Sequence, residues 1–146
     1  MASYMRIEDL QVYQKLCELH LEVSELTRAW PRDERFELTS QVRRSSNSAP
    51  ANLAERHSDR HVRNKIEGVN RSRGEALETV HHLHVARLKG YITQTVSDQF
   101  RSRYQECVRM LNGMEKTLEQ QLPIESRRWP TDQTHAPDPV TLNPKP

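Results

Sequence analysis

Eight basic side chains gather in the stretch from Arg43 to Arg73, against three acidic ones, which gives this stretch a charge of +5. They are Arg43, Arg44, Arg56, Arg60, Arg63, Lys65, Arg71 and Arg73. Arginine and lysine neutralise phosphates and supply the sequence-independent part of nucleic-acid affinity. The run therefore predicts a surface that binds RNA or DNA. The alternative is a solvated helix surface paired with Glu55, Asp59 and Glu67, since the whole chain carries only +2.

A second set of polar side chains has helical spacing. Gln41, Ser48, Asn52 and Glu55 follow one another at intervals of seven, four and three residues, so one helix face can hold them all. Glu78, on a later helix, could meet them. Such a face could bind a ligand, or it could form a buried hydrogen-bonded network that fixes helix register or a subunit interface. Because buried polar groups need partners, we predict the structural network.

The candidates for a metal site are incomplete. Glu78 and His81 form an E-x-x-H string, which is half of the di-iron element of helical bundles, and no second such string occurs. Cys17 and Cys107 lie far apart in the sequence, so they do not resemble a zinc motif, and each is typical of a small packing residue. We predict no metal and no cofactor.

Motifs for catalysis are also missing from the sequence. The serines Ser45, Ser46 and Ser48 lie outside any G-x-S-x-G context, and no G-x-x-x-x-G-K-[ST] loop is present. We predict that the protein is not an enzyme.

Apolar residues recur at helical spacing in four segments. These segments run from about Glu8 to Trp30, from Asp33 to Arg56 or Ser58, from His61 to Lys89, and from Thr93 or Thr95 to Leu122. Pro31 should end the first helix, Pro50 should kink or break the second, and Gly90 should follow the third. Short connections make neighbouring helices antiparallel. We therefore predict an all-α, up-down-up-down four-helix bundle.

The predicted bundle domain comprises residues 1–122. Residues 123–146 have five prolines from Pro130 onward and few apolar residues, so they are predicted to form an extended or disordered tail. The sequence has no run of about 18 apolar residues and no apolar N-terminal segment of signal-peptide length. We therefore expect a cytoplasmic protein with no membrane partner.

Four stretches in order resemble one known family. They read IEDLQVY at 7–13, RFELTSQVRRSSNSAPANLAE at 35–55, SRGEALET at 72–79 with ARLKGYI at 86–92, and RMLNGMEKTL at 109–118. This combination resembles the four-helix-bundle proteins encoded within bacterial 23S rRNA intervening sequences. There are departures. Arg56 stands where the family has glycine, Glu75 where it has serine, and Lys65 and Gly68 where apolar or aromatic residues are usual.

The resemblance implies a homopentamer of four-helix bundles with no established catalytic activity. Relatives act as accessory proteins of diversity-generating retroelements, where they bind a reverse transcriptase and nucleic acid. Together with the basic run, the resemblance leads us to expect a non-enzymatic, pentameric scaffold that binds RNA or DNA. One role that it implies is that of an accessory to a reverse transcriptase. The alternative is a purely protein-binding or structural oligomer with no role in nucleic-acid binding.

Overall fold

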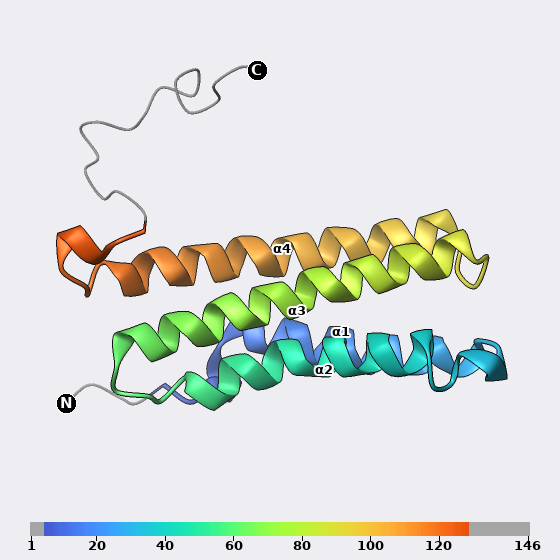
Figure 1. The fold of residues 1–146 in the computed structure, drawn as a ribbon, viewed down its shortest axis with the longest axis horizontal. Helices are drawn as coiled ribbons and strands as arrows, with labels where there is room; N and C mark the ends of the chain where they lie inside the picture. Colours follow the sequence, from blue (N-terminus) through green and yellow to red (C-terminus); the bar gives the residue numbers. More distant parts are fainter. Residues whose placement is uncertain (1–4, 129–146) are drawn as a thin grey trace, which may run out of the picture.

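The computed structural model describes residues 5–128 and forms an antiparallel four-helix bundle, as the sequence predicts (Figure 1). The helices are α1 (Gln11–Leu26), α2 (Leu38–Arg56), α3 (Val62–Leu88) and α4 (Gln94–Glu119). Short 3-10 turns flank them at Ile7–Asp9, Thr27–Ala29, Arg32–Glu34 and Ile124–Ser126. No strand occurs within the described range.

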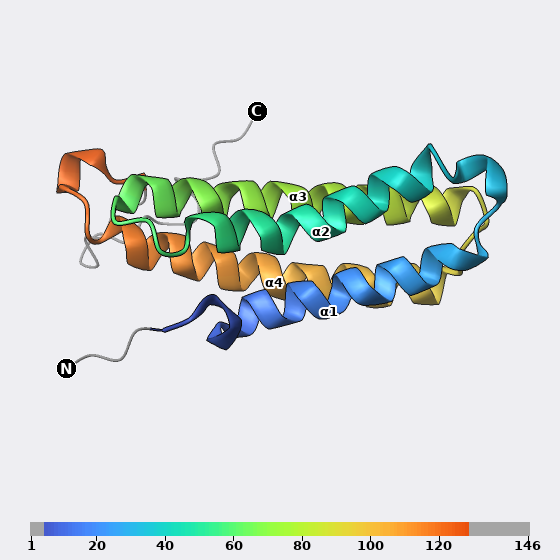
Figure 2. The same cartoon turned by 90° about the horizontal axis from the view of Figure 1, so that it is seen from below.

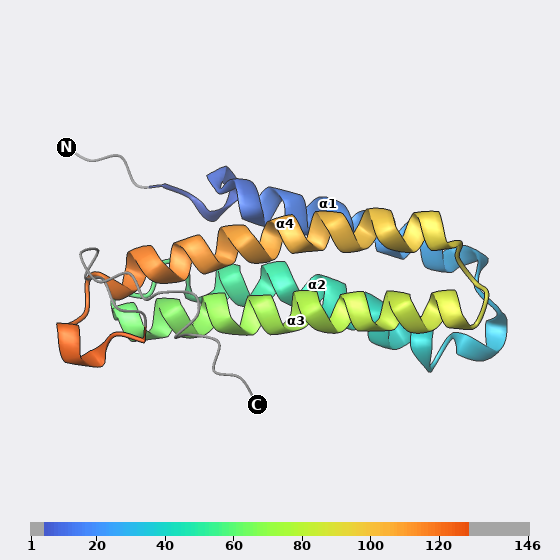
Figure 3. The same ribbon diagram turned by 90° about the horizontal axis from the view of Figure 1, so that it is seen from above.

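The helices run up, down, up and down along one long axis. Figures 2 and 3 view the bundle from opposite sides, and in both α2 lies beside α3 while α1 lies beside α4. The α1–α2 and α3–α4 connections share one end of the bundle. The α2–α3 turn lies at the other end, together with the start of α1 and the end of α4 (Figure 1). Residues of the basic run therefore extend from the middle of the bundle to one end.

Several helix boundaries follow from local chemistry. The Thr93 hydroxyl accepts a hydrogen bond from the backbone N–H of Val96 at 3.1 Å and caps the start of α4. Gly90 has a φ of +83°, the left-handed conformation expected of a glycine that ends a helix. The α2 helix continues through Pro50, so the break that was one of the two predicted outcomes does not occur there.

The start of α2 differs from the prediction. The helix begins at Leu38 rather than at Asp33, because a 3-10 turn over Arg32–Glu34 follows Pro31. The buried Glu34 carboxylate accepts hydrogen bonds from the Lys89 amine and the Tyr91 hydroxyl, each at 2.6 Å. These bonds lower the pKa of Glu34, and the bond from Lys89 has the largest effect. The carboxylate thus ties the α1–α2 connection to the α3–α4 connection.

All four helices contribute buried apolar side chains to the core. Buried apolar side chains include Val12, Leu16, Leu19 and Val23 of α1, Leu38, Val42, Ala49 and Leu53 of α2, and Phe100, Tyr104, Cys107 and Leu111 of α4. On α3 the apolar Val69, Ala76 and Leu83 are buried. Ser72, Thr79 and Ala86 are buried there, whereas Leu77 and Leu88 are exposed.

Residues just beyond the predicted domain boundary pack onto the bundle. The Arg127 guanidinium donates to the backbone oxygens of Leu122 and Gln120, at 3.0 and 2.9 Å. The Arg128 backbone N–H donates to the Glu119 carboxylate at 3.0 Å. The folded part of the chain therefore extends beyond residue 122. The predicted tail from residue 129 onward lies outside the described residues.

Candidate nucleic-acid interface

The eight residues of the basic run divide into two groups in the structure. Four of them hydrogen-bond or pair with side chains of the same subunit, mostly between helices. These are Arg43, Arg44, Arg71 and Arg73, called here the internal arginines. The other four surround the α2–α3 turn. They are Arg56, Arg60, Arg63 and Lys65, called here the turn cluster.

Arg73 makes the most buried of the internal contacts. Its guanidinium donates to the Glu115 carboxylate at 2.7 Å and to the Asn112 side-chain oxygen at 2.8 Å. It also donates to the Asn70 side chain on its own helix. The Glu115 side chain is 1% exposed and that of Arg73 18%. Because this pair joins α3 to α4 in the interior, Arg73 is not available to a phosphate in this conformation.

Arg43 and Arg44 hold α2 against its two neighbours. Arg43 donates to the Thr27 hydroxyl at 2.7 Å, next to the end of α1. Arg44 pairs with Glu78 of α3 at 2.5 Å and lies 3.7 Å from Glu75. The Arg44 pair is partly exposed, so its contribution to stability is small.

Arg71 pairs with Glu67 one turn earlier on α3, at 2.8 Å. The pair lowers the pKa of Glu67, mainly through the hydrogen bond between the two side chains. Both side chains are about half exposed, so a phosphate could displace the carboxylate at little cost.

The turn cluster forms no hydrogen bond or ion pair of this kind within the described chain. After the hydrogen bonds that Asp59 and Glu67 accept from His61 and Arg71, the charge of Arg56 nevertheless helps to lower the pKa of these two carboxylates. Arg60 and Arg63 are exposed and line an open hollow of about 460 Å³ together with Leu122 from the end of α4. Lys65 is half-buried, and its stem helps to line a small apolar cavity of about 120 Å³ with Leu53 and Val69. This arrangement leaves the charged heads at the end of the bundle.

Asp59 shapes the turn that carries the cluster. Its carboxylate accepts hydrogen bonds from the His61 backbone N–H at 2.8 Å and from the Asn64 side chain at 3.2 Å. The hydrogen bond from the His61 backbone contributes most to lowering the pKa of Asp59. The carboxylate sits before the first turn of α3, where a negative charge is favourable. Asp59 therefore orders the turn and forms no ion pair with Arg60 or Arg63.

Arg127 and Arg128 are basic residues of this end that the sequence analysis missed. They were assigned to the predicted tail, but Arg127 bonds to the Leu122 backbone oxygen, and Leu122 lines the same hollow as Arg60 and Arg63. Arg128 lies 3.7 Å from the Glu115 carboxylate. The adjacent pair of arginines in the sequence was the available signal. The Pro-rich composition of the following residues concealed it.

The five residues of the predicted polar network do not bond to one another's side chains in the subunit. The Asn52 amide donates to the Ser48 backbone oxygen at 2.8 Å, Gln41 and Glu55 are exposed, and Glu78 contacts Arg44 and His82. Asn52 and Glu78 instead line an open groove of about 450 Å³ between α2 and α3. A role of these residues at a subunit interface stays a prediction.

The polar pair that does lie inside the bundle is a different one. The hydroxyls of Ser45 on α2 and Thr79 on α3 lie 2.7 Å apart, and both residues are fully buried. This bond fixes the register of the two helices. It performs the structural role that we had assigned to the neighbouring polar set.

Residues suited to metal binding or nucleophilic chemistry stay apart. Glu78 contacts His82 at 3.1 Å, while His81 is exposed. No group of three or more histidine, cysteine, aspartate or glutamate residues between residues 5 and 128 could hold a metal ion. Both cysteines are free, and burial raises the pKa of Cys107 to about 11, which disfavours the reactive thiolate.

The fold defines a class of small helical-bundle proteins, and comparison with known proteins gives the family. The family model of the 23S rRNA-intervening sequence protein matches residues 8–113, and the chain belongs to this family. A crystal structure of a protein of unknown function from the S23 ribosomal protein family of Bacteroides thetaiotaomicron is similar, with a TM-score of 0.66 and 24% identity. The match covers 72% of this chain and 98% of that one. No curated protein matches the sequence.

None of the helices within the described chain is long and apolar enough to cross a membrane.

Proposed function

We propose that this protein is a non-enzymatic, homo-oligomeric helical scaffold that binds RNA or DNA at the end of the bundle that carries the α2–α3 turn. One observation carries this proposal. Arg56, Arg60, Arg63 and Lys65 gather at that turn without an ion-pair partner among residues 5–128, unlike the internal arginines. When such cations bind phosphates, the counterions condensed on the nucleic acid are released. This release gives affinity without base recognition.

Few aromatic side chains lie near the turn cluster, so we expect recognition of the backbone and shape of the nucleic acid rather than stacking on its bases. The description of the family names a 23S rRNA-intervening sequence, which makes a structured RNA the first probe to use. A reverse transcriptase is proposed as a protein partner from the resemblance alone. The scaffold is proposed to need no cofactor and to act in the cytoplasm.

Assembly into a homopentamer is proposed from the resemblance and is supported by exposed apolar residues. Leu77 and Leu88 are 52% and 62% exposed and, eleven residues apart, lie on one face of α3. Leu21 of α1 is 67% exposed. Two exposed apolar side chains on one helix face can form part of a contiguous apolar patch, and such patches mark protein interfaces. In a ring, each turn cluster would be repeated, so weak phosphate contacts would add through multivalency.

The binding proposal is tested by titrating a structured RNA at two salt concentrations. The test variant carries Arg60→Glu and Arg63→Glu. The control carries Arg101→Glu and Arg109→Glu, two exposed α4 arginines that form no ion pair in the described chain. Both variants change the net charge equally. We expect micromolar or tighter binding with a steep negative salt slope, and a loss of at least about 10-fold in the test variant only. No binding at low salt would refute the proposal.

Native mass spectrometry of the same preparation tests the oligomer. We expect a pentamer, and we expect Leu77→Lys with Leu88→Lys to shift it to smaller species because the charges would have to be buried. A monomer at micromolar concentration in the unmodified protein would contradict the assembly. A copurification with a reverse transcriptase that survives nuclease treatment would support that partner.

A purely protein-binding or structural oligomer is the second candidate, and the internal arginines favour it. Each of these four side chains bonds to an oxygen of the same subunit, which favours a contribution to the stability of the bundle. If this candidate is correct, the Arg60→Glu and Arg63→Glu variant should keep its oligomeric state and its protein partners. It should also bind RNA no worse than the Arg101→Glu and Arg109→Glu control.

A further inference from the structure

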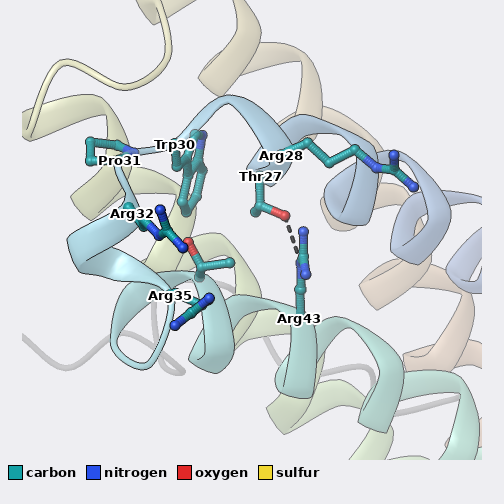
Figure 4. A pocket seen from close by; sticks show the side chains of 8 residues that line it. Thr27, Arg28, Trp30, Pro31, Arg32, Arg35 and Arg43 are labelled. Carbon is teal, nitrogen blue, oxygen red and sulfur yellow. Dashed lines mark hydrogen bonds between the residues drawn. The ribbon is translucent and has the colours of Figure 1, made fainter.

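A cavity of about 310 Å³ lies at the opposite end of the bundle from the turn cluster, beneath the α1–α2 connection. Arginines from the connection and from the first turns of α2 line it (Figure 4). They are Arg28, Arg32, Arg35 and Arg43. No carboxylate is found among the lining side chains in the described chain. Arg28 points away from the other side chains and pairs with Glu25 at 3.6 Å, so Arg32, Arg35 and Arg43 bring the positive charge that faces this cavity.

Arg43 brings a charge that the protein itself does not neutralise. Its guanidinium is half-buried and bonds only to neutral oxygens, the Thr27 hydroxyl at 2.7 Å and the Ser24 backbone oxygen at 3.3 Å. The positive field reaches His20, whose pKa is lowered by burial first and by Arg43 second. A charge removed from water without a counter-ion is unfavourable, so an anion in the cavity would stabilise it.

Arg32 and Arg35 face the same space without a carboxylate within ion-pair distance in the described residues. Figure 4 shows their guanidinium groups on one side of the cavity and that of Arg43 on the other. The nearest buried carboxylate, Glu34, is already bonded to Lys89. The Arg35 guanidinium lies 4.7 Å from the centroid of the exposed Phe36 ring, and neither Arg32 nor Arg35 is held by a carboxylate of the described chain.

The Trp30 ring and the Thr39 side chain also line the cavity. Trp30 is 7% exposed, and its indole N–H has no hydrogen-bond partner in the described chain. Its ring packs against that of Tyr91, with the centroids 5.7 Å apart. A buried donor without a partner is uncommon in folded proteins. The ring also places a spectroscopic reporter in the wall of the cavity.

We propose that this cavity binds the phosphate group of a phosphomonoester of mononucleotide size. Guanidinium groups form paired hydrogen bonds with phosphate oxygens, and several around one cavity favour a dianion over a carboxylate. The volume lies at the lower end of the range of about 300–1,000 Å³ that is usual for small-molecule pockets. A free nucleotide and the phosphorylated end of a strand both carry such a group, and the experiment distinguishes these two sources. This inference is independent of the turn cluster.

The test uses the fluorescence of Trp30 in the full chain carrying Trp129→Phe, which leaves Trp30 as the only tryptophan. Three probes are titrated: inorganic phosphate, a nucleoside 5′-monophosphate and the corresponding nucleoside. We expect a saturable change with a Kd of about 1 mM or tighter for the monophosphate, a weaker one for phosphate, and none for the nucleoside. Equal responses to nucleoside and monophosphate, or no saturation, would overturn the proposal. A 5′-phosphorylated oligonucleotide that binds better than its unphosphorylated form would identify a strand end as the source.

A charge-reversal variant with Arg32→Glu and Arg35→Glu locates the site. We expect it to weaken monophosphate binding at least about 10-fold, while the control variant Arg101→Glu with Arg109→Glu stays within about 2-fold. An equal loss in both variants would overturn the proposal, since it would show only long-range charge. If the test variant does not fold, the indole N–H resonance of Trp30 in the unmodified protein decides. It should shift with the monophosphate, and an unmoved resonance would refute the site.

Discussion

The internal arginines and the turn cluster have the same chemistry but different surroundings. Arg44, Arg71 and Arg73 lie along the middle of the bundle, and Arg43 lies nearer the α1–α2 connection. In each case a neighbouring helix or turn supplies an oxygen. The turn cluster lies where α2 ends and α3 begins, and its residues form no ion pair in the described chain, although Arg56 and Lys65 are half-buried against the neighbouring helices. The comparison shows that position relative to the neighbouring helices decides whether an arginine stabilises the fold or remains available to a ligand.

The largest effect is expected at Arg73. Replacing it with alanine leaves Glu115, which is 0% exposed, as a buried charge whose remaining cation, Arg128, is 3.7 Å away. Removing one partner of a buried ion pair costs about 3–5 kcal/mol. We expect the Arg73→Ala variant to lose that much of its free energy of unfolding in urea denaturation. Adding Glu115→Gln should recover part of the loss, because it removes the stranded charge.

A loss of less than about 1 kcal/mol in Arg73→Ala would contradict this expectation. It would place Arg73 with the surface arginines and remove the main difference between the two groups.

Arg43 should give the next largest effect. Its substitution with alanine removes two hydrogen bonds between α2 and the end of α1, but both acceptors are neutral and Arg43 is only half-buried. We expect a loss of about 1–2 kcal/mol in the free energy of unfolding. Arg43→Lys should lose nearly as much, because an ammonium cannot reproduce the guanidinium geometry. Equal stability of the lysine variant and the unmodified protein would show that charge alone matters here.

A substitution at Gly68 tests the packing of α2 against α3 beside the turn cluster. A Cβ atom at Gly68 would lie 2.9 Å from the Arg56 Cβ and 3.1 Å from the Asn52 backbone oxygen, so α2 would have to move away. We expect Gly68→Ala to destabilise by about 1 kcal/mol, because the clash exceeds the gain in helix propensity. Gly74, with no atom within 4 Å of the corresponding position, is the matched control, and Gly74→Ala should stabilise the protein.

The same contact explains two departures from the family pattern. Arg56 stands where the resembling family has glycine, and Gly68 stands where it has a larger residue. The small residue has moved from α2 to α3, and the close approach of the two helices is kept. A double-mutant cycle between Gly68→Ala and Arg56→Gly should therefore show a coupling of at least about 0.5 kcal/mol. Additive effects of the two substitutions would refute this explanation.

The bundle was predictable because the apolar spacing on α1, α2 and α4 is regular. On α3 the apolar Val69, Ala76 and Leu83 are buried as their spacing indicates, but the spacing does not indicate that Ser72 and Thr79 are buried beside them. Small polar side chains are buried there because α2 approaches closely, and local periodicity contains no information about that approach. The composition indicated the basic run, but it did not indicate which of its residues would be internal arginines and which would belong to the turn cluster. The ion pair between Arg73 and Glu115 joins two residues that are 42 positions apart in the sequence, and local spacing does not indicate such a contact.

Arg60 and Arg63 should give the smallest effect on stability. Both are exposed and form no ion pair within residues 5–128, so replacing both with alanine removes almost no contact. We expect the free energy of unfolding to change by less than about 0.5 kcal/mol, in contrast to Arg73→Ala. The same double variant should weaken RNA binding and reduce the slope of its salt dependence by about two. A loss of stability as large as that of Arg43→Ala would erase the distinction between the two groups. Full stability combined with weakened binding would establish that the turn cluster is kept for a ligand.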